Sequence, residues 1–184
     1  MKHFNDQIKD HLETIKSLTS FDNDLNKLIL NLKKIIQSKN KIFFCGNGGS
    51  ASDAEHLCAE FIGRFNENRS PYPAISLNSN IANITCISND FGYDQLFARQ
   101  LEALATKEDI VFALTTSGNS QNIIQGLKQA KIIGMQIVTF LGKDGGECRG
   151  MGDFEFLINS NDTARIQECH MFLGHYICSM LEKI

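Results

Sequence analysis

Short apolar segments alternate with segments of helical periodicity over most of this 184-residue chain. The apolar segments are KIFFC (41–45), AISL (74–77), DIVFALT (109–115), QIVTFL (136–141) and FEFLI (154–158). The remaining pattern predicts helices at 50–65, within 79–105, at 120–134 and at 163–183. Short apolar strands that are connected by long helices are typical of a parallel sheet covered on both faces. The sequence therefore predicts an α/β fold of three layers.

Two further helical patterns precede the first strand, at residues 3–19 and 22–38. In the second pattern the apolar residues at helical spacing are Leu25, Leu28, Ile29, Leu32, Ile35 and Ile36. We expect an N-terminal helical hairpin over residues 1–39 that forms oligomer contacts, followed by an α/β core over 40–184. The chain has only two prolines, no obvious linker and no internal repeat, so a single domain is predicted.

The charge pattern argues against nucleic acid and anionic membranes as partners. Eighteen basic and twenty-one acidic residues are scattered along the chain and give a net charge of −3. No apolar stretch approaches the roughly 20 residues of a membrane span, and the segment MKHFNDQIKDH lacks the apolar centre of a signal peptide. The six cysteines form no C-x-x-C pair, so we expect reduced thiols packed in the core. These features favour a cytoplasmic protein with a small-molecule partner.

Three predicted strands end in glycine-rich loops that can bind a ligand. GNGGS (46–50), TTSGNS (115–120) and GKDGGE (142–147) each follow a predicted strand. Ligands of parallel sheets bind beyond the carboxyl ends of the strands, and backbone N–H groups at a helix start attract anions. Neither of the first two loops ends in the G-K-[ST] of a nucleoside triphosphate site. A phosphate monoester is the predicted ligand.

A dinucleotide site is the alternative interpretation of the first loop. Gly46, Gly48 and Ala51 match the spacing G-x-G-x-x-A. That site also needs an acidic residue at the end of the second strand, about 20 residues further on. Glu67 has the required separation but lies in the polar segment NENRSPYP, and the strand itself ends at Asn78. The dinucleotide match is therefore interpreted as chance, and a glycine turn that only allows close packing remains open.

Two predicted helices carry polar side chains suited to catalysis or metal binding. His56 and Glu60 are four residues apart and share one helix face, where they form either a surface pair or a site for a proton or metal. The last helix is apolar in its second half but contains Gln167, His170 and His175. Each histidine is either a hydrogen-bonded core group or a group for proton transfer near neutral pH.

Taken together, these segments resemble a known family. The sequences CGNGGSASDAEHLCAE, ISNDFGYDQLFARQLEAL, TTSGNSQN, GKDGGE and ARIQECH are similar, in order and spacing, to the phosphoheptose isomerases of the sugar isomerase (SIS) superfamily. The resemblance covers nearly the whole chain. It implies an SIS-type, flavodoxin-like sandwich in a cytoplasmic homotetramer that binds zinc. It also implies conversion of sedoheptulose 7-phosphate to D-glycero-D-manno-heptose 7-phosphate, the first step toward bacterial surface heptose in lipopolysaccharide or capsule.

The resemblance also implies roles for individual residues. The catalytic pair would be Glu60 and His175, and the zinc ligands would be His56, Glu60, Gln167 and His175. The substrate-binding residues would be Asn47, Gly48, Gly49, Ser50, Glu60, Asn89, Asp90, Thr115, Thr116, Ser117, Ser120 and Gln167. Two positions depart from the family pattern: Ala164 stands where some members carry Asp, and Thr115 replaces a common Ser.

The reaction itself indicates which groups are needed. Ketose-to-aldose isomerisation moves a proton from C1 to C2 through an enediol and needs a base near carbon and an acid near oxygen. Glu60 is the expected base and His175 the group that serves the oxygens, while the loops hold the phosphate. Zinc on the same side chains would position the oxygens, stabilise the enediolate or hold the fold, and the sequence leaves these three roles open.

The spacing of the implied ligands predicts a site shared between subunits. Gln167 and His175 are eight residues apart, which is about 12 Å along a helix axis, close to the limit for two side chains that bind one ion. The main rival function is a non-catalytic SIS module that binds a sugar phosphate or a replication-initiator protein. An isomerase of another sugar phosphate is the second rival. The presence of both Glu60 and His175 favours the enzyme, and a single SIS unit favours heptose over the aminosugar enzymes, which have two units.

Overall fold

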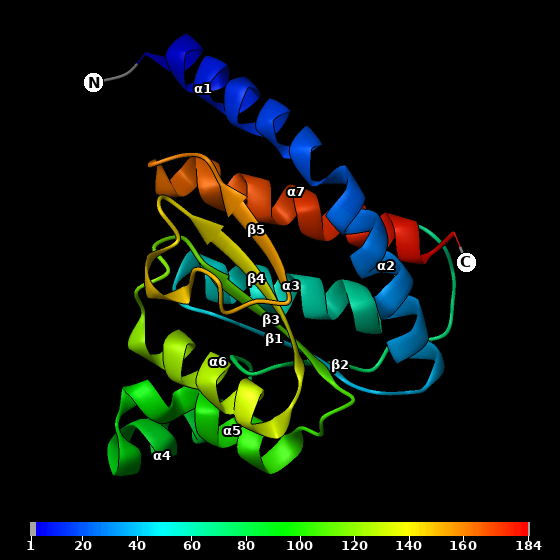
Figure 1. Cartoon of the computed structure of the whole chain (residues 1–184), viewed down its shortest axis with the longest axis vertical. Coiled ribbons are helices and arrows are strands. Elements are labelled where there is room, and N and C mark those ends of the chain that lie inside the picture. Colours follow the sequence, from blue (N-terminus) through cyan, green and yellow to red (C-terminus); the bar gives the residue numbers. More distant parts are fainter. Residues whose placement is uncertain (1–2, 184) are drawn as a thin grey trace.

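The computed structural model describes residues 3–183 and has an open parallel sheet between two layers of helices (Figure 1). The strands are β1 (Ile42–Gly46), β2 (Ala74–Ser76), β3 (Ile110–Thr115), β4 (Gln136–Gly142) and β5 (Phe154–Ile158). The α-helices are α1 (Phe4–Ser17), α2 (Asp22–Gln37), α3 (Gly49–Ile62), α4 (Ile81–Phe91), α5 (Leu96–Leu104), α6 (Gln121–Ile133) and α7 (Thr163–Leu181). Short 3-10 turns are η1 (Leu18–Phe21), η2 (Tyr93–Gln95) and η3 (Gly146–Cys148). The predicted α/β architecture is confirmed.

The sheet has the strand order β2-β1-β3-β4-β5, and every neighbouring pair is parallel. β1 and β3 are fully buried, as expected for central strands of a sheet that is covered on both faces. The order reverses between β1 and β3, because the chain first adds β2 on one side of β1 and then β3 on the other. This reversal leaves a crevice beyond the carboxyl ends of β1 and β3.

Two hydrophobic cores lie on the two faces of the sheet. One face packs against α2, α3 and α7, with Leu28, Leu57 and Leu173 fully or almost fully buried. The other face packs against α5 and α6, with Phe97 and Leu127 equally buried. Side chains that alternate along each strand supply both cores, as Phe43 and Phe44 do in β1.

The two N-terminal helices are present where the sequence predicts them, but they do not lie side by side. α1 leads through η1 into α2, and Figure 1 shows the three as one long, bent helical run across α7. Both α1 and α2 contact α7. Phe4, Ile8 and Leu12 on α1 remain exposed. The expected hairpin is thus an extended arm, and its role in oligomer contacts stays a prediction.

Burial of the cysteines agrees with the sequence in all but one case. Cys45, Cys58, Cys148, Cys169 and Cys178 are buried free thiols, whereas Cys86 on α4 is an exposed one. Burial raises the pKa of Cys45 to about 12, so this thiol is inert at neutral pH. Among the described residues, no helix is both long enough and apolar enough to cross a membrane.

α3 ends earlier than the helix predicted for 50–65, because Gly63 follows Ile62 in a non-helical conformation. The Arg69 guanidinium then satisfies carbonyl groups of the last turn, donating to the oxygens of Glu60 at 2.7 Å and Phe61 at 2.9 Å. A cationic side chain at this end also complements the negative end of the helix dipole.

Helices α3 and α7 pack closely because α7 has a glycine at their contact. A Cβ atom added at Gly174 would overlap the side chain of Leu57, which is 1% exposed. The neighbouring residue in α7 is His175, which the family resemblance assigns to the catalytic pair. The small residue therefore controls the distance between the two helices that carry the predicted catalytic groups.

Replacing Gly174 by Ala should force α3 and α7 apart or strain Leu57. Overpacking of a dense core usually costs about 1–3 kcal/mol, and we expect a loss of that size in the free energy of unfolding. Denaturant unfolding of Gly174→Ala measures it. The double variant Gly174→Ala/Leu57→Ala should lose less than the sum of the single losses, because the overlapping atoms are removed. Additive losses would contradict the contact.

Candidate active site

A cavity of about 240 Å³ lies at the strand-order reversal. It is lined by Asn47, Gly49, Ser50, Leu114, Thr115, Thr116, Ser117, Ser120, Thr163 and Gln167. Among the described residues, none of the side chains that line this cavity is charged. Its polar groups are instead hydroxyls, amides and the backbone of loops that end in helices. The two glycine- and hydroxyl-rich loops, which the sequence predicts to face one anion, both contribute residues to this cavity.

Three helices begin at this cavity: α7 starts at Thr163, which lines it, and α3 and α6 start there as well. α3 starts at Gly49 and α6 starts at Gln121, directly after the cavity residue Ser120. The free N–H groups of a helix start and its positive dipole end favour an anion. Gly118 has a φ of +65°, and a Cβ atom there would overlap the carbonyl of Gly145, so the loop packs tightly on the loop after β4. The packing therefore supports the conformation of the loop around Gly118 without a ligand.

A pair of asparagines fastens the two cavity loops together. Nδ2 of Asn47 donates to Oδ1 of Asn122 at 2.8 Å, and Nδ2 of Asn122 donates back to Oδ1 of Asn47 at 2.8 Å. The hydroxyl of Tyr93 donates to the same Asn47 oxygen at 2.9 Å. Asn122 is buried, so its amide would be costly to leave without partners. These bonds hold the loop after β1 against the start of α6.

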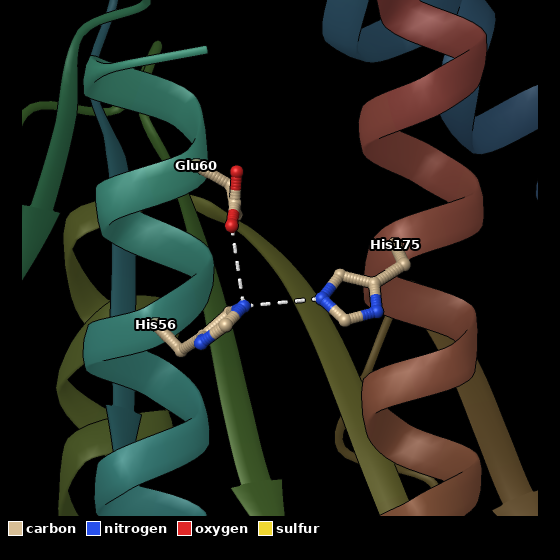
Figure 2. Close-up of side chains that lie close together, drawn as sticks. All are labelled: His56, Glu60 and His175. Atoms are coloured by element: carbon tan, nitrogen blue, oxygen red, sulfur yellow. Dashed lines mark hydrogen bonds and ion pairs between the residues drawn. The ribbon is translucent and has the colours of Figure 1, made fainter. Parts of the chain in front are cut away.

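A cluster of His56, Glu60 and His175 lies further along α3 (Figure 2). His56 and Glu60 lie one turn apart on α3, and His175 faces them from α7. Nε2 of His56 lies 3.1 Å from Nε2 of His175 and 3.3 Å from Oε1 of Glu60. The donor atoms of all three lie within 4.8 Å of one another. Glu60 and His175, the predicted catalytic pair, thus come from separate helices and meet at His56.

The surroundings of His175 favour its neutral form. Burial lowers its pKa first, the nearby His56 lowers it further, and Glu60 raises it in part, so that the net pKa lies below the ordinary value. The ring of Phe65 also stacks on the His175 ring, with centroids 5.2 Å apart and an interplanar angle of 22°. A neutral imidazole near neutral pH can accept a proton or bind a metal ion.

Gln167 connects the cavity with the cluster. It lines the 240 Å³ cavity, and it also lines a groove of about 590 Å³ together with His175. Its amide lies against Gly49, where any side chain would overlap it. Gln167 is two turns of α7 before His175, about 12 Å along the axis, so its role as a metal ligand stays a prediction.

Not all predicted residues come together in one chain. Gly48 is in the first loop with a φ of +58°, but it does not line the cavity. Asn89 and Asp90 lie exposed on α4 and bond to each other, outside the described lining of the cavity. Their substrate-binding roles stay predictions. His170 is fully buried and bonds to the carbonyl of Leu141 with one ring nitrogen, which makes it a core group.

The structure adds neighbours that the sequence did not single out. Asp53 lines the groove with Gln167 and His175, and its Oδ2 atom is buried without a hydrogen-bond partner in the described part of the chain. Burial raises the pKa of Asp53 to about 6, although His56 partly opposes the rise. The sequence offered one indication of Asp53: it lies three residues before His56, so the two side chains are neighbours on one face of the helix. No local pattern indicated Phe65, which reaches His175 from a loop.

Comparisons with known proteins identify the family. The family model for the SIS domain matches residues 3–142. The phosphoheptose isomerase of Helicobacter pylori strain P12 is 41% identical over 174 residues, which are 94% of this chain and 91% of that protein. The chain belongs to the phosphoheptose isomerase family of SIS domain proteins. The predicted family and the predicted class of enzyme, a sugar-phosphate isomerase, are confirmed.

Two solved structures of the phosphoheptose isomerase family share the whole fold. The phosphoheptose isomerase from Francisella tularensis superposes with a TM-score of 0.85 at 31% identity and covers 100% of both chains. The phosphoheptose isomerase from Neisseria gonorrhoeae has a TM-score of 0.83 at 30% identity, over 99% of this chain and 100% of that one. The SIS-type sandwich predicted from the sequence is therefore confirmed.

The cluster predicts opposite pKa changes in two variants. His56→Asn should raise the pKa of His175, because it removes a neighbouring positive charge that disfavours protonation. Glu60→Gln should lower that pKa, because it removes the carboxylate that favours the imidazolium. NMR titration of the histidine Cε1–H signals, with a chelator present, measures both. His11→Asn is the control and should leave the His175 pKa unchanged. Shifts of the same sign in both cluster variants would contradict the arrangement.

Proposed function

We propose that this protein converts sedoheptulose 7-phosphate to D-glycero-D-manno-heptose 7-phosphate. The reaction would take place in the cytoplasm, as a step toward bacterial surface heptose in lipopolysaccharide or capsule. The similar proteins described above are phosphoheptose isomerases, which supports a phosphorylated sugar as the substrate. The observation that carries the proposal is the layout of α3: its first turn lines an anion-type cavity, and its later turns carry His56 and Glu60 opposite His175. A sugar anchored by its phosphate would extend along α3 toward that cluster.

The loops would bind the phosphate without a charged side chain. Hydroxyls of Thr116, Ser117 and Ser120, together with backbone N–H groups at the start of α3, would donate to the phosphate oxygens. Thr115 instead accepts from the N–H of Gly118 at 3.1 Å and shapes the loop. Such binding places C1 and C2 for reaction and can reduce the barrier by several kcal/mol.

The acid-base chemistry would fall to Glu60 and His175. Glu60 abstracts the proton from C1 of the ketose and returns it to C2, while His175 moves the second proton between O1 and O2. Glu60 points one oxygen at His56, which leaves the second oxygen for the substrate. The His175 pKa, held below its ordinary value by burial, keeps the imidazole able to accept a proton at neutral pH.

Zinc is the metal that the cluster would hold. Imidazole nitrogen and carboxylate oxygen are both atoms that zinc takes as ligands. The three ligand atoms lie within 4.8 Å of one another, and Nε2 of His56 lies 3.1 Å and 3.3 Å from its two neighbours, so the cluster suits a single ion. His56, Glu60 and His175 would be the ligands, and Gln167 would complete the set if its side chain approached from the groove. When bound, zinc would polarise the substrate oxygens as a Lewis acid.

The Glu60→Gln variant should lose turnover of sedoheptulose 7-phosphate by about 100-fold or more while it still binds inorganic phosphate, because the base lies outside the phosphate cavity. A coupled assay of heptose 7-phosphate and calorimetry with phosphate measure the two properties. Ser120→Ala is the matched comparison: it removes a hydroxyl from the phosphate cavity and should weaken phosphate binding. Wild-type protein that makes no heptose 7-phosphate, with added zinc or with chelator, would favour a non-catalytic sugar-phosphate module.

We also propose that the enzyme is a homo-oligomer, with a tetramer as the expected state. The exposed side chains Phe4, Ile8 and Leu12 form one apolar stripe at spacings of four residues on α1. An apolar groove of about 360 Å³ lies between the N-terminal arm and α7, where Leu25 and Phe172 are among the lining residues. A second copy of the chain offers matching apolar surface, and its approach would place further residues at the groove beside His175.

Charge placed on this stripe should dissociate the oligomer. In the double variant Ile8→Glu/Leu12→Glu, sedimentation velocity should show monomers, because two carboxylates cannot be buried unpaired in an apolar contact. Turnover should fall with the loss of association if the site draws residues from two subunits. Lys9→Glu, on another face of α1, is the control. A wild-type monomer with full activity would overturn the proposal.

A further inference from the structure

Residues 63–72, between α3 and β2, are held by a carboxylate from the far end of the chain. Glu182 directly follows α7, and its side chain is 2% exposed. The carboxylate accepts hydrogen bonds from the backbone N–H groups of Phe65 at 2.8 Å, Asn66 at 2.8 Å and Glu67 at 3.0 Å. Burial alone raises the pKa of Glu182, but these bonds and Arg69 outweigh it, and the pKa lies below its ordinary value.

Arg69 joins the same carboxylate to the end of α3. Its Nε atom forms an ion pair with Glu182 at 3.5 Å, and its terminal nitrogens donate to the carbonyl oxygens of Glu60 and Phe61. Its guanidinium also lies over the ring of Tyr72, 3.7 Å from the centroid, and the Tyr72 hydroxyl donates to the carbonyl of Leu181 at 3.0 Å. Arg69, Tyr72 and Glu182 thus form a latch between the ends of α3 and α7.

The latch holds Phe65 against His175. Two of the three bonded N–H groups belong to Phe65 and its neighbour Asn66, so the backbone position of Phe65 depends on Glu182. The Phe65 ring stacks on the imidazole of His175, while the ring of His56 approaches with its centroid 5.2 Å away at 61°. A stacked ring restricts rotation of the imidazole. The orientation that remains points Nε2 of His175 at His56.

We propose that Phe65, held by Glu182 and Arg69, is a positioning residue for the catalytic pair. This inference rests on the roles proposed above for Glu60 and His175. The latch acts at the C-terminal ends of α3 and α7, whereas the phosphate cavity lies at the N-terminal end of α3. Loss of the latch should therefore misplace the acid-base groups and leave the phosphate contacts in place.

The kinetic test compares two substitutions of Phe65. Phe65→Leu keeps an apolar side chain but removes the ring. It should lower kcat by about 10-fold or more, because small displacements of reacting groups strongly reduce the rate. The KM for sedoheptulose 7-phosphate should stay unchanged within about twofold. Phe65→Tyr keeps the ring and should retain wild-type kcat. Glu182→Gln should behave as Phe65→Leu does, since its NH₂ group cannot accept the backbone N–H bonds. Glu67→Gln is the control, because it removes the same charge from an exposed side chain of the loop.

A spectroscopic test does not depend on turnover. In chelator-treated protein, the ring of Phe65 should shift the Cε1–H signal of His175, assigned with a His175→Gln variant. The signal should move in Phe65→Leu and Glu182→Gln, and stay in Phe65→Tyr and Glu67→Gln. Wild-type kcat and an unmoved signal in Phe65→Leu would overturn the proposal, even if thermal unfolding showed lower stability. If the wild type lacks turnover, the proposed substrate fails, while the NMR signal still decides whether Phe65 orients His175.

Discussion

The close packing of α3 against α7 is the contact on which the site depends. Gly174 allows the two helices to approach, because any Cβ atom there would overlap Leu57. The approach brings Nε2 of His56 on α3 within 3.1 Å of Nε2 of His175 on α7. Densely packed interiors transmit small displacements, so a change in the spacing of these helices would move the proposed catalytic groups.

Under the proposed function, helix α3 would serve both binding and chemistry, because its two ends face different parts of the site. Its first residues, Gly49 and Ser50, line the cavity beyond β1 and β3, and its last two turns carry His56 and Glu60. The parallel sheet decides where this helix begins, since the strand order reverses between β1 and β3. With the proposed roles, one helix of this fold would carry both an anion site and a proton-transfer site.

The sequence predicted the elements well because each has a strong local pattern. Strand β5 matches its predicted range, and the glycine and hydroxyl residues after β1 and β3 line one cavity, as expected from parallel strands. The end of α3 was predicted about three residues too late, because Arg69 and Gly63 determine it through contacts outside the helix. The N-terminal helices form a bent arm rather than a hairpin, because both pack on α7.

By itself, the sequence determined which chemistry is available: loops that suit phosphate, a His56–Glu60 pair on one helix face, and a histidine in an apolar helix. Only the tertiary structure decided which of these groups meet. His56 and His175 are 119 residues apart in sequence, and Phe65 and Glu182 are 117 apart. No local periodicity encodes such pairs, because they arise from packing of separate helices. For the same reason, the fold alone showed that Asn89 and Asp90 lie outside the cavity of a single chain.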